Sequence, residues 1–321
     1  MAAGPAGIPV RDIRCGAAAG GAVHAHRRFS RLAERRPPDE GRKGRRRGRH
    51  PGGTRPCFGT GRGGLGMAIL ETSGLTRMFG GLSAVDRLDL SVEEGEIRGL
   101  IGPNGSGKTT ALNLITGYLK PSRGAVTYRG SEVTGRQPHD LARMGLVRTF
   151  QITTLFENLT VRDNVLHGSH LNNPTSLMGA MRRSGRYRRQ SAEMEDRVRE
   201  LLAFVGLGER IDAVARDLSA GEHRYLEIAI ALAAGPRMLL LDEPATGLNP
   251  EEAAFLMNLI RTLRSQGVTV LLVEHNMRLI TNICTRITVL NFGAKIAEGT
   301  PEEIVDNPDV ITAYLGKRRG A

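Results

Sequence analysis

The chain has 321 residues, of which 40% are hydrophobic, and a formal charge of +12 at pH 7. This length allows one large domain with its own hydrophobic interior. The charge alone suggests a nucleic-acid-binding protein, but residues 1–66 hold 15 basic and 4 acidic residues, whereas residues 67–321 hold 30 and 29. We therefore expect no specific nucleic-acid partner for the folded part of the chain.

Residues 1–66 form a basic arm rich in Arg, Gly and Pro, with GRKGRRRGRH at 41–50. The arm lacks an apolar period, so we predict that it is disordered. It is a tail that attracts RNA or lipid, an Arg-rich transit peptide, or sequence that precedes the natural start of the protein. We favour the third alternative, with initiation at Met67, because the pattern of a folded protein begins there.

The sequence gives no sign of a membrane-spanning segment or of a disulfide framework. No stretch of the sequence reaches the roughly 20 apolar residues that a membrane span needs. Since a secretory apolar segment is also missing, we expect a cytoplasmic chain. The three cysteines, Cys15, Cys57 and Cys284, have neither the spacing of a disulfide framework nor that of a metal site.

After a β-rich part at 69–92, the pattern predicts a strand at 96–101, a glycine-rich loop and a helix at 108–118. The loop fits G-x-x-x-x-G-K-[ST]. In that pattern, backbone N–H groups hold phosphate oxygens, the lysine reaches the terminal phosphates and the hydroxyl reaches Mg²⁺. A glycine-rich turn without a ligand is the alternative. The predicted nucleotide-binding residues are Gly102, Pro103, Asn104, Gly105, Ser106, Gly107, Lys108, Thr109 and Thr110.

The segment from about 152 to 220 is predicted to be helical, because apolar residues repeat at helical spacing from Val198 and stop at Gly206. Within it, the basic run RRSGRYRR at 182–189 is a solvated loop or helix face, or it contacts phospholipid head groups.

The pentapeptide LSAGE at 218–222 precedes an apolar helix predicted at 222–233. Ser219 and Gly221 therefore stand at a helix start. A serine at this position normally caps its own helix. The same hydroxyl and the exposed N–H groups can instead face an anion, and the sequence leaves both alternatives open.

A run of apolar residues at 238–241 predicts a core strand that ends in Asp242 and Glu243. At the carboxyl edge of a parallel sheet, Asp242 suits a water-mediated contact with Mg²⁺, and Glu243 suits the polarisation of an attacking water. The alternative is an acidic turn, since Asp-Glu-Pro is a plausible turn sequence.

Two further strands, at 268–273 and 286–291, alternate with helices at 251–265 and 276–283, as a parallel sheet requires. His275 follows the first of these strands.

In this order, the motifs resemble those of the ATP-binding cassette (ABC) ATPases, from about Ile69 to about Leu315. The resemblance implies an α/β fold in which a P-loop ABC ATPase core has a mainly parallel sheet, an N-terminal antiparallel β part and a helical subdomain at about 152–220. The ABC ATPase domain would span 67–317, followed by a short tail at 318–321. The implied ligands are ATP and Mg²⁺.

The resemblance also implies residue roles. Phe79 would stack on adenine, Gln151 would sense Mg²⁺ and touch the membrane partner, and His275 would contact the γ-phosphate. Asp242, Thr109 and Gln151 would serve the metal, and the catalytic groups would be Glu243, His275, Gln151 and Lys108. A packed core aromatic is the alternative for Phe79, and a hydrogen-bonded histidine at a strand end is the alternative for His275.

In the same family, Ser219 and Gly221 close on the γ-phosphate of the nucleotide held by the opposite subunit, and the loop at 247–249 crosses the dimer interface. Three residues depart from the commonest pattern. Ala220 replaces a glycine, Glu222 replaces a glutamine and brings a negative charge near the phosphate, and Asn249 replaces an aspartate.

Four stretches most resemble the ATPases of branched-chain amino acid importers: RTFQITTLFENLTVRDNV, LLLDEPATGLNPEE, LLVEHNMRLI and the C-terminal EGTPEEIVDNPDVITAYLG. The last stretch predicts a pair of helices. The resemblance implies a peripheral ATPase on the cytoplasmic face of the membrane. Its partners would be integral-membrane permeases, a second ATPase subunit and, indirectly, a solute-binding protein.

The solute stays open, because near relatives handle urea, short amides or small carboxylates and because Ile230 stands where importer ATPases often carry arginine. The alternatives are the ATPase of a lipopolysaccharide exporter and a soluble ABC protein of translation or DNA repair.

Overall fold

The computed structural model describes residues 68–149, 155–169 and 185–315, with the backbone alone at 185–191 and 315. The basic arm, Gln151 and the tail at 318–321 lie outside the described residues. In the part that is described, no helix is both long and apolar enough to cross a membrane.

The N-terminal part is a four-stranded antiparallel sheet in the order β2-β1-β4-β5. Its strands are β1 (Ala68–Phe79), β2 (Leu82–Glu93), β4 (Arg123–Tyr128) and β5 (Ser131–Glu132). The β-rich part predicted at 69–92 is thus confirmed as two strands. The two later strands were not predicted, because β4 joins β1 across the whole phosphate-loop segment.

The second sheet has six strands in the order β10-β9-β3-β8-β7-β6. Five of them are parallel, and β10 lies antiparallel to β9 at one edge. Every residue of the three strands β3, β7 and β8 is buried, as expected for a parallel sheet covered on both faces. The strands are β3 (Ile97–Ile101), β6 (Leu146–Arg148), β7 (Met238–Asp242), β8 (Thr269–Val273), β9 (Arg286–Asn291) and β10 (Ala294–Gly299).

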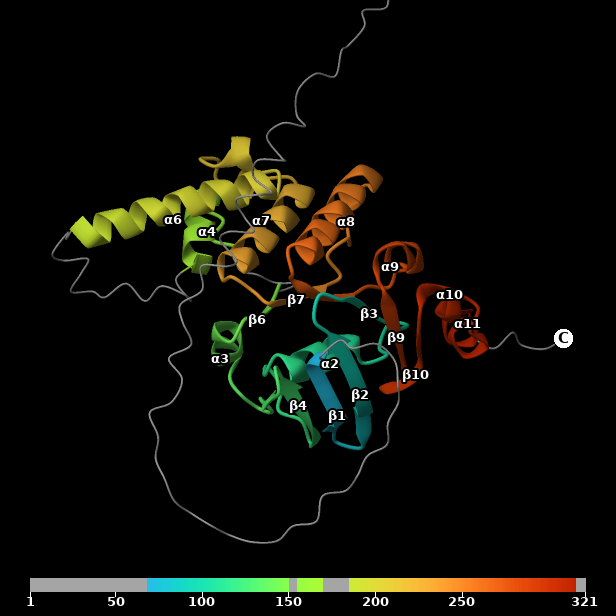
Figure 1. The fold of residues 1–321 in the computed structure, drawn as a ribbon. Coiled ribbons are helices and arrows are strands. Elements are labelled where there is room, and N and C mark those ends of the chain that lie inside the picture. The colour runs from blue at the N-terminus through green and yellow to red at the C-terminus, as the bar shows by residue number, and fades with distance from the viewer. Residues whose placement is uncertain (1–67, 150–154, 170–184, 316–321) are drawn as a thin grey trace, which may run out of the picture. The chain divides into compact units, whose positions relative to one another are not determined.

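The described helices fall into groups that Figure 1 separates clearly. Helices α4, α6 and α7 contact one another at one end of the six-stranded sheet, next to α8, and α9 to α11 lie near β9 and β10. The helices are α2 (Lys108–Ile115), α3 (Pro138–Arg143), α4 (Val161–Ser169), α6 (Gly185–Phe204), α7 (Ala220–Ala233), α8 (Pro250–Ser265), α9 (Met277–Ile283), α10 (Pro301–Val305) and α11 (Pro308–Leu315), with short 3₁₀ turns at Gly208–Arg210 and Ala215–Asp217.

Several ends differ from the sequence-based prediction. The helix predicted at 108–118 stops at Ile115, because Gly117 takes the left-handed conformation (φ 77°) and its Cβ position is blocked by the Arg136 carbonyl. The basic run at 182–189 is described only from Gly185 onward, where its backbone is helical. The predicted C-terminal helix pair is confirmed as α10 and α11.

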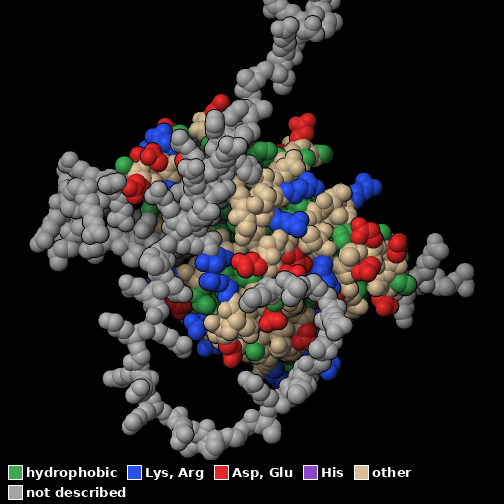
Figure 2. Space-filling model, in the orientation of Figure 1, with side chains coloured by type: hydrophobic (Ala, Val, Ile, Leu, Met, Phe, Trp, Pro, Cys, Tyr) green, Lys and Arg blue, Asp and Glu red, His purple; other side chains and the backbone are tan. Residues whose placement is uncertain are grey.

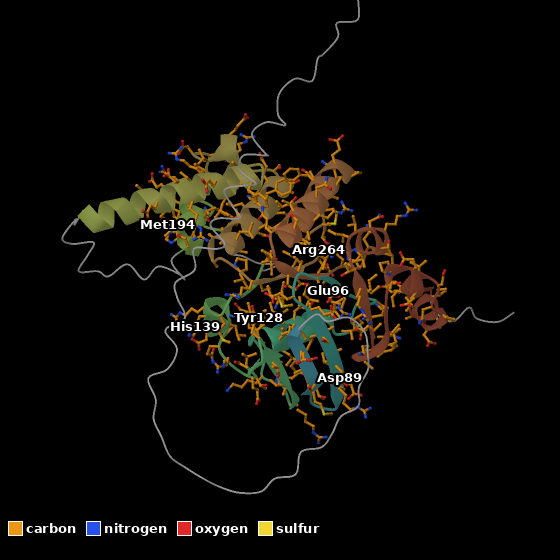
Figure 3. The ribbon with its side chains drawn as sticks, in the orientation of Figure 1. Asp89, Glu96, Tyr128, His139, Met194 and Arg264 are labelled. Carbon is orange, nitrogen blue, oxygen red and sulfur yellow. The ribbon has the colours of Figure 1, made fainter. Side chains whose placement is uncertain are left out.

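The core that positions the site lies between the two sheets, with α2 packed inside it. Leu112 and Ile115 of α2 join Leu240 and Leu271 of the parallel sheet in one buried cluster. Tyr128 of β4, labelled in Figure 3, belongs to the same cluster and is fully buried. Both ends of the phosphate loop are therefore anchored in packed structure.

The surface of the described part is mixed in charge. On the face shown in Figure 2, the Lys and Arg side chains are interspersed with Asp and Glu side chains. This agrees with the near balance of charge counted from the sequence beyond residue 66.

Candidate active site

The phosphate loop runs from the end of β3 to the start of α2, and its shape depends on two glycines. At Gly102 (φ 156°) an added Cβ would collide with the backbone oxygen of Leu290 on β9. At Gly107 (φ 100°) it would collide with the backbone oxygen of Ala84 on β2. The loop therefore fits between the two sheets only with hydrogen at both positions.

Lys108, the first residue of α2, turns its Nζ back onto the loop. It donates to the carbonyl oxygens of Gly102 at 2.8 Å and Pro103 at 3.1 Å. Burial lowers the pKa of Lys108, and the nearby carboxylates of Glu243, Asp242 and Glu274 oppose that shift. The buried ammonium group is thus held by two loop carbonyls within the electrostatic influence of three carboxylates.

The loop offers unused polar groups to an anion. The Ser106 hydroxyl is buried and makes no hydrogen bond within the described part of the chain. Thr109 is exposed in the first turn of α2, where backbone N–H groups have no helical partner. An exposed helix start next to a glycine-rich loop and a buried lysine suits a polyphosphate.

Asp242 and Glu243 leave the end of β7 in different environments. The Asp242 side chain is 1% exposed, and its Oδ2 accepts a hydrogen bond from Arg148 at 2.7 Å. Glu243 is one of four described non-glycine residues with positive φ (46°), and its backbone N–H donates to the Val273 oxygen of β8 at 2.9 Å. Its side chain is 22% exposed. The strained backbone turns this carboxylate out of the sheet toward solvent.

His275 and Glu274 follow β8 beside this pair. His275 Nδ1 lies 3.7 Å from Glu243 Oε1, and its side chain is 52% exposed. Glu274 is buried, and its Oε1 accepts from the backbone N–H of Ala245 at 2.9 Å. Burial raises the pKa of Glu274, while this backbone hydrogen bond opposes the rise. Glu274 thus fixes the turn after Glu243.

Phe79 ends β1 and is 46% exposed. The guanidinium carbon of Arg77 lies 4.8 Å from the centre of its ring. The alternative of a packed core aromatic is therefore wrong, and a ring face is accessible for stacking.

Ser219 and Glu222 form a reciprocal cap at the start of α7. The Ser219 hydroxyl accepts from the Glu222 N–H at 3.2 Å, and the Glu222 carboxylate accepts from the Ser219 N–H at 2.8 Å. The latter bond lowers the pKa of Glu222, with help from Arg210 at 3.0 Å. The charge that distinguishes Glu222 from the usual glutamine is thus used locally and paired with Arg210. Within one chain, the local cap is the arrangement that exists.

The start of α7 lies against the start of α8. A Cβ on Gly221 would overlap the Glu252 carboxylate, and the Tyr225 hydroxyl donates to the Glu252 backbone oxygen at 3.2 Å. Asn249 caps α8 by accepting from the Glu252 N–H at 2.9 Å. Asparagine caps a helix about as well as aspartate, so this departure leaves α8 intact. Ser219, Gly221 and Asn249 thus form a second cluster, separate in sequence from the phosphate loop.

Two residues near the site were not predicted. Arg148 binds Asp242 from β6, a contact that spans 94 residues. Tyr314 of α11 has a buried hydroxyl, and burial raises its pKa to about 12 while the backbone of Gly102 opposes the rise. No local signal reveals either contact, because each joins segments that are distant in sequence.

The donor chemistry near Asp242 fits Mg²⁺. Among the described residues there is no group of three or more His, Cys, Asp and Glu side chains of the kind that binds a metal by itself. The described candidates for Mg²⁺ ligands are one carboxylate (Asp242) and one hydroxyl (Thr109). So few protein ligands suit an ion that keeps several waters and shares the oxygens of a bound phosphate. Gln151, the third predicted metal residue, lies outside the described residues.

Comparison with known proteins extends this picture. Residues 85–246 match the family described as ABC transporter, and residues 294–319 match one described as Branched-chain amino acid ATP-binding cassette transporter. The high-affinity branched-chain amino acid transport ATP-binding protein BraF of Pseudomonas aeruginosa is 46% identical over 250 residues, which cover 78% of this chain and 98% of that protein.

Solved structures share the fold. A nucleotide-free ATP-binding cassette from an ABC transporter superposes with a TM-score of 0.69 at 32% identity, over 78% of this chain and 100% of that one. A dimeric bacterial ABC transporter cassette superposes with a TM-score of 0.62 at 26% identity, over 73% and 99%. The phosphate loop, the acid pair on β7 and this similarity along most of the chain lead to one conclusion: the protein belongs to the ATP-binding cassette family, the nucleotide-binding ATPases of ABC transporters.

Proposed function

We propose that the chain is the ATP-hydrolysing subunit of an importer for branched-chain amino acids or related small polar solutes. The observation that carries the proposal is the C-terminal match. Residues 294–319 match a family described as a branched-chain amino acid transporter, and they cover β10, α10 and α11, which contain none of the predicted nucleotide-site residues. Similarity in a segment without catalytic demand favours a shared transporter type over a shared chemistry alone.

Each predicted residue receives a role in hydrolysis under this proposal. The backbone N–H groups between Gly102 and Thr110, except at Pro103, which has none, bind phosphate oxygens, and Lys108 leaves the loop carbonyls for the terminal phosphates. Phe79 stacks on adenine with its exposed ring. The site contains a turned-out carboxylate, Glu243, whose position suits it to accept a proton from the attacking water.

His275 Nδ1 lies 3.7 Å from Glu243 Oε1, close enough for both side chains to act on the same γ-phosphate. Bound Mg²⁺ would neutralise phosphate charge, with Thr109, Asp242 and Gln151 as its protein partners. Gln151 keeps this role as a proposal carried by the sequence motif.

A second cassette completes the site. The N-terminus of α7, with Ser219 and Gly221, has the partial positive charge that binds anions, and an approaching phosphate would take over the N–H groups that the Ser219–Glu222 cap binds in the single chain. We assign these groups to the γ-phosphate of a nucleotide held by the partner cassette, with the loop at 247–249 at the interface. The similarity to a dimeric cassette supports this assembly. The partner is a copy of this chain or a related chain.

A pocket of about 420 Å³ gives a place for the membrane partner. It lies between α3 and β6 on one side and α4 and α7 on the other, with Ile230 and Ala234 among its apolar walls. His139, labelled in Figure 3, lines its α3 side. We propose that a permease segment docks here, with the helical region as the part that moves, and that the chain sits on the cytoplasmic face of the membrane.

The experiment that tests this function is co-purification. The full chain, tagged and expressed in its native cells, should bring down integral-membrane permeases from detergent extracts, together with a second cassette if the assembly is heteromeric. Recovery of ribosomal or DNA-repair proteins in place of permeases would contradict the proposal. Recovery of a lipopolysaccharide-export permease would select the exporter alternative.

The matched control is a variant with a charged residue in the pocket, Ala142→Glu. It should fold and bind ATP, because Ala142 is only partly buried and contributes to the pocket wall and not to the phosphate loop. It should lose the permeases from the purified material. Full retention of the permeases by this variant would show that docking occurs elsewhere.

A further inference from the structure

Arg148, the last residue of β6, joins two parts of the nucleotide site. One terminal nitrogen of its guanidinium donates to Asp242 Oδ2 at 2.7 Å, and the other donates to Asn113 Oδ1 at 2.5 Å. The Arg148 and Asp242 side chains are 7% and 1% exposed. Asn113 belongs to α2, the helix that begins with the phosphate loop. One buried side chain thus connects β6, β7 and α2.

The chemistry of this contact is specific to arginine. The planar guanidinium holds two acceptors at once in a fixed fork, whereas a lysine ammonium is a single point charge on a flexible chain. The Asp242 carboxylate is buried, so its direction is set by the groups that bind it. The fork therefore fixes both the charge balance and the orientation of Asp242.

The same residue lines the pocket between α3, β6, α4 and α7. Arg148 shares the pocket wall with Tyr118, Thr149 and Glu227. Burial raises the pKa of the Tyr118 hydroxyl, and the Arg148 charge opposes that rise. Arg148 thus binds the nucleotide site through Asp242, while the same residue lines the pocket and its charge acts on Tyr118 there.

We propose that Arg148 is a positioning residue that couples the pocket to Asp242, so that an occupant of the pocket and the metal-binding carboxylate act on one guanidinium. This rests on the proposed function, which assigns the pocket to a permease segment and Asp242 to the metal. A shift of β6 caused by the occupant moves Arg148, and Asp242 follows because its buried carboxylate is held by that side chain. No change in the phosphate loop is needed.

The first test measures metal binding and not hydrolysis. In the full-length chain, Arg148→Lys keeps the charge and loses the fork. Affinity for a fluorescent, non-hydrolysable ATP analogue is measured in EDTA and during a Mg²⁺ titration. We expect nearly unchanged affinity in EDTA. The Mg²⁺ requirement, measured as the Mg²⁺ concentration that gives half of the full effect on affinity, should rise by about 10-fold, the lower end of the effect of removing a residue that orients a metal ligand. An unchanged Mg²⁺ requirement would overturn the proposal.

Two variants separate positioning from general damage to the fold. Arg98→Lys is the matched control, since Arg98 is also buried and also holds two acceptors, in its case the carboxylates of Glu96 at 2.9 Å and Glu298 at 2.8 Å. It should lower the melting temperature without changing the Mg²⁺ requirement. Asn113→Ala leaves the Arg148–Asp242 pair in place and removes half of the fork, so an intermediate increase is expected. Equal changes in the Arg98 and Arg148 variants would mean a structural role only.

The second test reads the coupling itself. A fluorophore is attached to Ala142→Cys on the pocket wall, in a chain with Cys15→Ser and Cys57→Ser. Addition of Mg²⁺ to the nucleotide-bound protein should change the pocket fluorescence, and Arg148→Lys should remove most of that change at saturating Mg²⁺. An equal signal in both proteins would refute the coupling. No permease is present in this test. Its failure would therefore concern the coupling through Arg148, whereas failure of the co-purification experiment would concern the transport function.

Discussion

Gly221→Ala separates the local role of the α7 start from its proposed role across a dimer. Gly221 has helical backbone, so alanine meets no backbone strain there. The added Cβ would overlap the Glu252 carboxylate, with Glu252 Cδ at 2.6 Å and Cγ at 3.2 Å. A flexible side-chain end can move away. The cost is then the hydrogen bond that the Asn249 backbone N–H donates to Glu252 Oε2, now 3.0 Å long.

The free energy of unfolding should change little. Breaking a helix cap costs about 1 kcal/mol. Replacing glycine by alanine in a helix returns up to about 1 kcal/mol. The two terms nearly cancel, so the melting temperature should stay within about 4 °C of the wild type. The nucleotide affinity of the isolated subunit should also stay the same, because its own phosphate loop is untouched.

Hydrolysis in the assembled transporter should fall, by roughly 10- to 100-fold, because a methyl group and a displaced carboxylate then stand where the partner's γ-phosphate approaches α7. Phosphate release by the purified complex measures this rate. Glu252→Gln is the control, since it removes the negative charge without adding an atom at position 221, and it should keep most activity. Normal hydrolysis by Gly221→Ala, or a matching loss of nucleotide affinity in the isolated subunit, would show that Gly221 has no role at the partner's γ-phosphate.

Three further predictions concern single side chains. Phe79→Ala should weaken ATP binding roughly tenfold while Phe79→Trp keeps it, because stacking of a base on an aromatic ring contributes about 1–3 kcal/mol; equal affinities in a fluorescence titration would exclude stacking. Cys284 should resist alkylation at pH 8 until the protein unfolds, since burial raises its pKa to about 12 and leaves a thiolate fraction of about 10⁻⁴; rapid labelling by mass spectrometry would contradict this. Burial raises the pKa of Glu274 in the folded chain above its value in the unfolded chain. The folded state therefore loses stability as the pH rises from the unfolded pKa through the folded pKa. Glu274→Gln lacks this loss, so its free energy of unfolding relative to the wild type should increase with pH in denaturant titrations. A difference between the two proteins that is constant with pH would show that the pKa of Glu274 is not raised in the folded chain.

The elements that carry the phosphate site could be predicted from the sequence because their signals are local. The strand at 97–101, the loop and the start of α2 follow one another within a dozen residues, and the apolar run before Asp242 marks β7. The family resemblance supplied the order of the motifs and the mainly parallel sheet. Both are confirmed by the fold.

The contacts that tune the site could not be predicted, because they form between strands whose spatial order is not their chain order. Sheet order brings β6 beside β7, and only then does Arg148 meet Asp242. The antiparallel edge strand β10 and the approach of Tyr314 to Gly102 also depend on the C-terminal segment folding back. The role of Glu222 also could not be predicted from the sequence. The sequence marks it as an unusual charge near phosphate, while the folded chain pairs it with Arg210 and the cap of α7.

The most direct measurement of the central claim is uptake of radiolabelled leucine, isoleucine and valine by cells that contain this chain as wild type or as Glu243→Gln. We predict that the variant assembles with its permeases and binds ATP, and that cells containing it take up these solutes no faster than cells from which the chain has been deleted. Wild-type uptake of all three amino acids in both the variant and the deletion strain would contradict it.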